Sequence, residues 1–235
     1  MFDLTPDEVT AVLLSLRVAL WSMAASLPAA LLVACVLSRY RFPGKTLIDG
    51  LVQLPLILPP VVTGFALLVL LGRHGLVGGW LDRHLGLVFA FRWTGAAVAS
   101  AVMGFPLMVQ AIRLSLDGVD RRLEDAARTL GANRPWVFLT VTLPLILPGV
   151  LAGCVLAFAK SLGEFGATIT FVSNIPGETQ TLPLAIYTLT QVPGGDAGAL
   201  RLTAVSVLLA LVAVAVAGPM SRAVSRRVQG HDAGD

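Results

Sequence analysis

Five apolar runs, each long enough to cross a lipid bilayer as a helix, constrain the fold of this chain more than any other feature. A helix rises about 1.5 Å per residue, so about 20 residues cross the roughly 30 Å of hydrocarbon. Of the 235 residues, 56% are hydrophobic and only 13% are charged, which is too apolar for a soluble domain of this size. The sequence therefore predicts an all-α integral membrane protein, with residues 1–235 forming one transmembrane domain. The runs cover residues 9–37, 54–71, 94–112, 143–163 and 202–219.

Two further apolar segments are too short or too charged to cross. Residues 75–93 carry an Asp-Arg-His triplet at 82–84, which predicts an outer loop with a short interfacial helix. Residues 181–191 are followed by a Pro-Gly-Gly turn and are expected to form an external helix at the membrane surface.

The distribution of lysine and arginine between the loops predicts the orientation. Cytoplasmic loops carry an excess of these residues, and eleven of them fall on one side against four on the other. The N-terminus is therefore expected outside and the C-terminus in the cytoplasm. The cytoplasmic group is Arg39, Arg41, Lys45, Arg113, Arg121, Arg122, Arg128, Arg134, Arg222, Arg226 and Arg227, and the outer group is Arg73, Arg83, Arg92 and Arg201.

Proline and glycine inside the runs predict that the helices pack as a bundle. Carbonyl groups freed by proline need partners from neighbouring helices, side chains or water. Gly149 and Gly153 form a small-xxx-small pair that lets another helix approach closely. This pair suits either packing within one subunit or a dimer seam, and we favour packing within the subunit.

Motifs of enzyme chemistry do not occur in the sequence. It has no G-x-x-x-x-G-K-[ST] loop for a nucleotide, no H-E-x-x-H and no G-x-S-x-G. The cysteines and histidines lack metal-ligand spacing, so no metal or cofactor is expected on this chain. The cations flank the apolar runs, which argues for membrane topology and against a nucleic-acid partner. Any energy for uphill transport must therefore come from a partner.

The loop over residues 117–142 contains a short helix that suits docking. Leu123, Ala126, Ala127 and Leu130 form one stripe at helical spacing, and small alanines permit a close approach. Gly131 follows the stripe and can take the left-handed conformation that ends a helix. The alternative is an ordinary amphipathic cytoplasmic helix.

This loop resembles the signature loop of ABC-importer permeases. The match consists of Asp125, Ala126, Ala127 and Gly131, followed by an aliphatic-x-Leu-Pro at residues 141–144. Either Asp125 or its neighbour Glu124 is a candidate for the polar contact to an ATPase subunit. By this resemblance the coupling residues are Glu124, Asp125, Ala126, Ala127, Arg128, Gly131, Leu143 and Pro144.

A second passage resembles the molybdate and sulfate branch of the same permeases. Gly-Glu-Phe-Gly at residues 163–166 follows the fourth run, and residues 172–187 are similar to molybdate members. Residues 53–60 extend the resemblance toward the first run. It implies a type I ABC importer permease with five transmembrane helices and a cytoplasmic coupling helix, carrying molybdate, with tungstate or sulfate as alternatives.

The resemblance also implies the partners and the location. We expect a homodimer in the bacterial inner membrane, with two ATP-binding subunits and a periplasmic molybdate-binding protein docked near residues 181–191. The partner subunits would use ATP, and their closure would draw the coupling loops together and tilt the attached spans outward.

Ionisable and hydroxyl side chains near the fourth run are candidates for the substrate pathway or gate: Lys160, Glu164, Thr168, Thr170 and Ser173. Lys160 and Glu164 are four residues apart, so we expect them to lie on one helix face and to be able to pair. They could attract and hold an oxyanion, or simply neutralise each other, and we favour the second interpretation slightly. Arg17 in the first run is expected to extend toward the outer interface.

Two other classes of function remain as alternatives to the permease. A secondary transporter needs no docking loop and more often has broken helices in inverted repeats, which the sequence does not indicate clearly. An intramembrane enzyme needs a nucleophile with a partner set, which Ser161, Lys160 and Glu164 do not provide.

Overall fold

The computed structural model describes the backbone of residues 4–229 and the side chains up to residue 213 and at residue 215. The ends of the predicted domain 1–235 and the side chains of Arg222, Arg226 and Arg227 lie outside the described residues. All regular secondary structure in the described part is helical, as the sequence predicted. In chain order the elements are α1 (Pro6–Arg39), α2 (Lys45–Ile57), α3 (Pro60–Leu71), α4 (Leu76–Leu85), α5 (Trp93–Asp117), α6 (Arg121–Thr129), α7 (Arg134–Val137), a π-helix (Phe138–Thr142), α8 (Leu143–Leu162), α9 (Gly166–Val172), α10 (Leu182–Thr190) and α11 (Asp196–Gln229).

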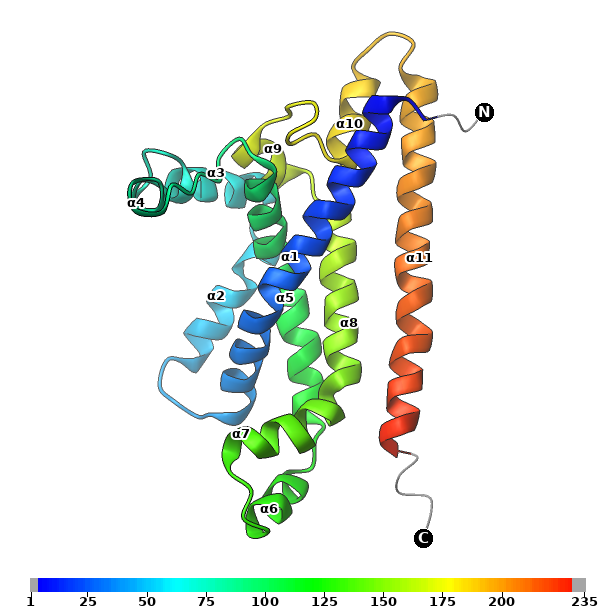
Figure 1. The fold of residues 1–235 in the computed structure, drawn as a ribbon. Coiled ribbons are helices and arrows are strands. Elements are labelled where there is room, and N and C mark those ends of the chain that lie inside the picture. Colours follow the sequence, from blue (N-terminus) through cyan, green and yellow to red (C-terminus); the bar gives the residue numbers. More distant parts are fainter. Residues whose placement is uncertain (1–3, 230–235) are drawn as a thin grey trace.

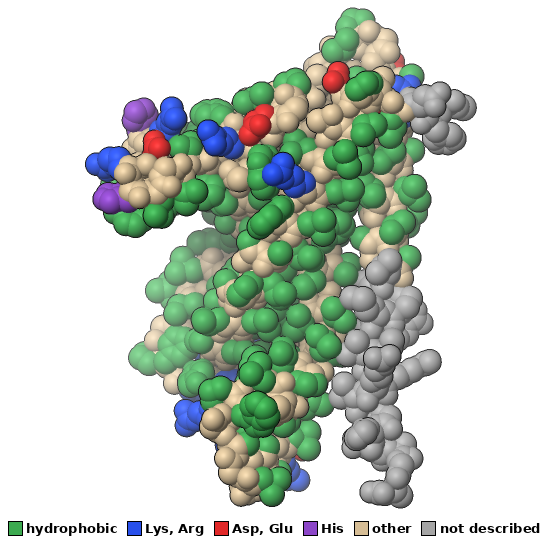
Figure 2. Space-filling model, in the orientation of Figure 1, with side chains coloured by type: hydrophobic (Ala, Val, Ile, Leu, Met, Phe, Trp, Pro, Cys, Tyr) green, Lys and Arg blue, Asp and Glu red, His purple; other side chains and the backbone are tan. Residues whose placement is uncertain are grey.

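Four helical segments are long and apolar enough to cross a membrane. They are α1, α5, the continuous stretch from α7 through α8, and α11. These segments pack side by side as one bundle (Figure 1). Figure 2 shows hydrophobic side chains over the middle of the bundle, with the charged ones gathered toward its two ends. This distribution fits a bundle whose middle lies in hydrocarbon.

The predicted span over residues 54–71 is not one straight helix, although the two helices that contain it are together long and apolar enough to form one broken span. The chain breaks there into α2 and α3, whose axes are bent by 113°. Pro59 and Pro60 lack amide hydrogens, and the residue before a proline is forced into an extended conformation. The backbone at Leu58 and Pro59 is accordingly extended, and α3 leaves the bundle sideways (Figure 1).

The two short apolar segments form short helices, as predicted. Within residues 75–93, α4 has ten residues and ends at Gly86, whose φ of 63° is the left-handed conformation that favours glycine. Within residues 181–191, α10 has nine residues and packs against α1 and α11. Neither helix is long enough to cross about 30 Å of hydrocarbon.

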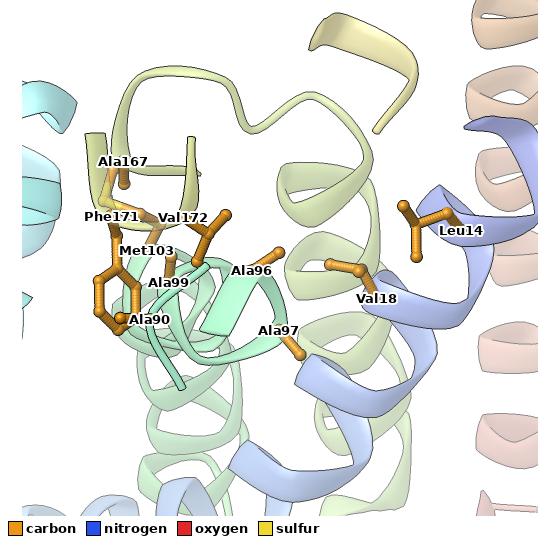
Figure 3. Packing of buried hydrophobic residues seen from close by; sticks show 10 residues of the cluster. All are labelled: Leu14, Val18, Ala90, Ala96, Ala97, Ala99, Met103, Ala167, Phe171 and Val172. Carbon is orange, nitrogen blue, oxygen red and sulfur yellow. The ribbon is translucent and has the colours of Figure 1, made fainter. Parts of the chain in front are cut away.

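Small residues set how closely the long helices approach one another. In one core cluster, Ala96, Ala97 and Ala99 of α5 lie between α1 and α9, with Phe171 filling the larger space (Figure 3). A Cβ added at Gly149 would lie 2.3 Å from the Ser115 Cβ, and one at Gly153 would lie 3.1 Å from the Met108 carbonyl oxygen. The glycine pair therefore serves packing of α8 against α5 within the subunit, as we had favoured.

The bundle has two dissimilar ends. We call the end that carries α6 and α7 the coupling end, and the end that carries α3, α4, α9 and α10 the distal end (Figure 1). The N-terminus of α1 lies at the distal end, where Thr5 and Glu8 form a capping box.

Candidate coupling and pathway sites

Local sequence signals define α6 at the coupling end. Asp120 caps the helix by accepting a hydrogen bond from the Arg122 amide at 2.9 Å. After α6, Gly131 has a φ of 89°, so the left-handed conformation expected at this position is confirmed. A cap at one end and a left-handed glycine after the other make α6 a short, well-bounded helix.

Several apolar residues are exposed on α6 and the segment after it, among charged neighbours. Leu130 is 89% exposed, Leu123 is 50% exposed and Ala126 is also exposed, whereas Ala127 is half-buried. Trp136 and Leu139, at 60% and 55%, extend this surface and were not among the predicted site residues. An apolar surface of this kind on a loop between long helices suits contact with another protein.

The two neighbouring acids of α6 have different environments. The Glu124 carboxylate turns inward, where Oε1 lies 2.6 Å from the Arg39 Nη2 and accepts a hydrogen bond from the Thr142 hydroxyl at 2.8 Å. Asp125 points outward and is 3.2 Å from the Arg128 guanidinium. Asp125 is therefore the acid available to a partner, while Glu124 ties α6 to the bundle. Sequence reasoning missed Arg39 because it lies 85 residues away along the chain.

A cavity of about 430 Å³ lies beside α6, between α1, α7 and the π-helix. Four arginines and two acids contribute to its wall, so the cavity is basic overall. The predicted coupling residues Leu143 and Pro144 start α8 just beyond it, half-buried and exposed respectively. The charged lining residues are Arg39, Arg121, Arg128, Arg134, Glu124 and Asp125.

At the distal end, Lys160 and Glu164 do pair, but not along one helix face. The Lys160 Nζ lies 2.6 Å from the Glu164 Oε2. The expectation of a shared helix is wrong, because α8 ends at Leu162 and Glu164 lies in the turn that follows. The other carboxylate oxygen accepts a hydrogen bond from the Ala167 amide at 3.0 Å, so Glu164 also caps α9. Glu164 is 2% exposed, and both its oxygens have partners within this subunit.

The hydroxyl candidates differ in accessibility. Thr168 is buried in α9, and the Thr170 hydroxyl donates to the Gly166 carbonyl within the same helix. Ser173 is exposed just after α9, with an uncommon positive φ of 66°. Of the three, Ser173 is therefore exposed, Thr170 is half-buried and Thr168 is buried.

The short helices α3 and α9 contact each other at two glycines. A Cβ added at Gly64 would lie 2.5 Å from the Ala167 carbonyl oxygen, and one at Gly166 would lie 2.8 Å from the Pro60 Cβ. Such close backbone approach requires glycine at both positions. Each of the two helices follows a break in the chain that the apolar runs did not indicate.

Arg17 interacts with an aromatic ring at the distal end. Its guanidinium carbon lies 3.7 Å above the ring of Trp93, the first residue of α5, and Trp21 packs against the same ring. A cation over an aromatic face is stabilised by the negative face of the ring. The charge of the exposed Arg17 is thus stabilised at the subunit's surface by the ring of Trp93.

Comparison with known proteins identifies the family. A family model described as the inner membrane component of binding-protein-dependent transport systems matches residues 26–228. The chain belongs to this family. Its members are components of binding-protein-dependent transport systems, which favours the permease over the secondary-transporter and enzyme alternatives.

Relatives within this transport family extend over nearly the whole chain. The molybdenum transport system permease protein ModB of Escherichia coli K12 is 57% identical over 97% of this chain and 99% of its own length. ModB of Haemophilus influenzae is 54% identical over 94% of this chain and 96% of its own length. The sulfate transport system permease protein CysT of Escherichia coli K12 is 39% identical over 86% of this chain and 72% of its own length.

Solved structures show that the fold is that of ABC importer permeases. A bacterial ABC transporter that imports the polysaccharide alginate matches with a TM-score of 0.69 at 19% identity, over 95% of this chain and 80% of that chain. The MetNI methionine ABC transporter, in an inward-facing conformation, matches with a TM-score of 0.65 at 14% identity, over 92% and 94% of the two chains. The predicted all-α permease bundle is confirmed.

Proposed function

We propose that this chain is the permease subunit of an ATP-driven molybdate importer. The assignment of molybdate as the substrate rests on the 57% identity with a molybdenum permease over 97% of the chain. The sulfate permease is less similar, at 39% over 86%. Tungstate and sulfate remain the alternative substrates, because tetrahedral dianions present similar charge to a pathway wall.

The apolar surface of α6 supports a coupling role. Ala126 and the half-buried Ala127 permit close contact with an ATPase subunit, and exposed Leu123 and Leu130 supply apolar area. Asp125 and Arg128 lie on the accessible side and would make polar contacts. Gly131 ends the helix, which fixes the direction in which α6 is presented.

A second copy of the chain and a binding protein complete the proposed importer. The helices α3 and α4 extend away from the bundle with exposed apolar side chains, including Phe65 at 59% and Trp80 at 51%. A partner copy would cover part of this surface, and two copies would present two α6 helices to two ATPase subunits. We propose that the periplasmic binding protein docks at the distal end, near α10.

With the ATPase subunits at the coupling end, that end lies in the cytoplasm and the distal end lies outside. This orientation can be tested separately. Asp196 at the distal end and Arg41 at the coupling end are both exposed. A cysteine at position 196 should react with an impermeant thiol reagent added outside intact cells that retain only their inner membrane, and one at 41 should not. Equal labelling of both would overturn the proposed orientation.

The substrate is tested by transport in a strain that lacks its own molybdate, tungstate and sulfate permeases. The chain is expressed with the ATPase and binding-protein components encoded for the same transporter, and uptake of labelled molybdate is measured with and without competing tungstate or sulfate. We expect saturable molybdate uptake that requires the ATPase. Sulfate uptake without molybdate uptake would overturn the substrate assignment.

A further inference from the structure

We propose that Glu124 is a positioning residue that transmits movement of α6 to both α1 and α8. This inference rests on the proposed coupling function of α6. The single carboxylate oxygen Oε1 contacts Arg39 at the end of α1 and Thr142 at the end of the π-helix that leads into α8. One buried group thus connects the coupling helix to two helices that are long and apolar enough to cross the membrane.

The contacts of Glu124 favour a role in transmitting movement through the bundle over a role in attracting a partner protein at the surface. Glu124 is 8% exposed and Thr142 is 4% exposed, and the Arg39 side chain is 18% exposed. Charge-assisted hydrogen bonds in such surroundings are short and directional, and loss of one partner leaves a buried charge uncompensated. The Asp125–Arg128 pair on the same helix has side chains that are 68% and 47% exposed, so it holds nothing inside the bundle.

The Thr142 contact of Glu124 lies in the π-helix that precedes α8. The Leu143 amide donates to the Phe138 carbonyl, which is the wider i to i−5 pattern. A π-helical turn contains an extra residue compared with an α-helix, and such turns occur frequently at functional sites. Thr142 is the last residue of this turn, so its hydrogen bond to Glu124 links α6 to the point where α8 changes helical form. Movement of α6 would therefore act on α8 at its least regular turn.

The test measures coupling and not activity alone. The complete importer, with its ATPase subunits and binding protein, is reconstituted in liposomes, and labelled molybdate imported is divided by phosphate released. We expect Glu124→Ala to lower this ratio by about tenfold, a typical size for coupling between sites, while ATP hydrolysis stays near the wild-type rate. Glu124→Gln, which retains an oxygen for Thr142 but no charge, should give an intermediate ratio and serves if the alanine variant folds poorly.

A matched control separates Glu124 from ion pairs in general. Asp49 of α2 and Arg113 of α5 form a pair at the coupling end, 3.0 Å apart, without contact to α6. Asp49→Asn should leave the ratio unchanged, and exchange of the charges in Arg39→Glu with Glu124→Arg should restore part of it. A merely structural role would lower thermal stability in both Asp49→Asn and Glu124→Ala without changing the ratio.

Two results would overturn the inference. One is a wild-type ratio in Glu124→Ala, and the other is an equal fall in Asp49→Asn. A wrong substrate assignment would give a different result from a wrong role for Glu124, because the wild-type importer itself would then fail to import molybdate. In that case the same ratio is measured with sulfate or tungstate, and the comparison of variants is unchanged.

Discussion

The two ends of the bundle are held together by different kinds of contact. At the distal end, α3 and α9 touch backbone to backbone, and Gly64 leaves no room for a Cβ. At the coupling end, ion pairs such as Arg39–Glu124 hold the elements, and apolar side chains such as Leu130 remain exposed beside them. The distal end should therefore be sensitive to added volume, and the coupling end to lost charge or a blocked surface.

The largest expected effect comes from added volume at the distal end. Gly64→Leu places a Cβ 2.5 Å from the backbone oxygen of Ala167, which cannot move away as a flexible side chain could. Overpacking costs about 1–3 kcal/mol and more where backbone must shift, so we expect a sharp loss of folded protein, measured as membrane yield and melting temperature. Gly50→Leu is the matched control, because a Cβ at Gly50 has nothing within 4 Å. Equal stability of the two variants would contradict the described α3–α9 contact.

The next largest effect is expected from substitutions that block the surface of α6. Gly131→Pro cannot adopt the φ of 89°, and Ala127→Trp fills a position meant for close contact. Both should abolish molybdate uptake and co-purification of ATPase subunits while the permease still inserts in the membrane. Val207→Trp adds similar bulk at an exposed position of α11 and should retain both. Normal uptake by the α6 variants would refute the docking role.

A third prediction decides between the two interpretations of Lys160. Removing one partner of a buried pair costs on the order of 3 kcal/mol, and less here because the Lys160 side chain is 29% exposed. If pairing is its role, Lys160→Met lowers uptake and adding Glu164→Gln restores it, since the glutamine oxygen can still accept from Ala167. The internal contacts of Glu164 lead us to expect this rescue. Labelled molybdate uptake at equal membrane levels decides it: a double variant as poor as Lys160→Met would favour oxyanion attraction instead.

The smallest expected effect concerns a neutral polar contact between α1 and α8. The Ser22 hydroxyl lies 3.1 Å from the Ser161 hydroxyl and also donates to the Ala19 carbonyl, so it keeps a partner when Ser161 is removed. Ser161→Ala should therefore cost no more than about 1 kcal/mol of stability and leave uptake unchanged. A large loss of uptake would show that this hydroxyl pair has a role in transport that packing does not explain.

Local signals in the sequence were sufficient for much of the fold. Apolar runs of sufficient length predicted five spans, of which four are long helices and the fifth is bent, and Gly131 takes the left-handed conformation expected after α6. These features depend on residues close together in the chain, where backbone geometry and hydrogen bonding follow local rules. The same kind of signal identified the stripe on α6 and its family resemblance.

Tertiary structure decided what local pattern could not. Hydropathy alone did not reveal the 113° bend between α2 and α3, although Pro59 and Pro60 marked the place. Nor could it decide which acid of α6 faces inward, because the answer depends on Arg39, 85 residues away. The sequence by itself determined the long helices, the local caps at some of their ends and the family resemblance. Which side chains meet across the bundle was decided only in the folded molecule, since burial and pairing of charge depend on neighbours that are remote along the chain.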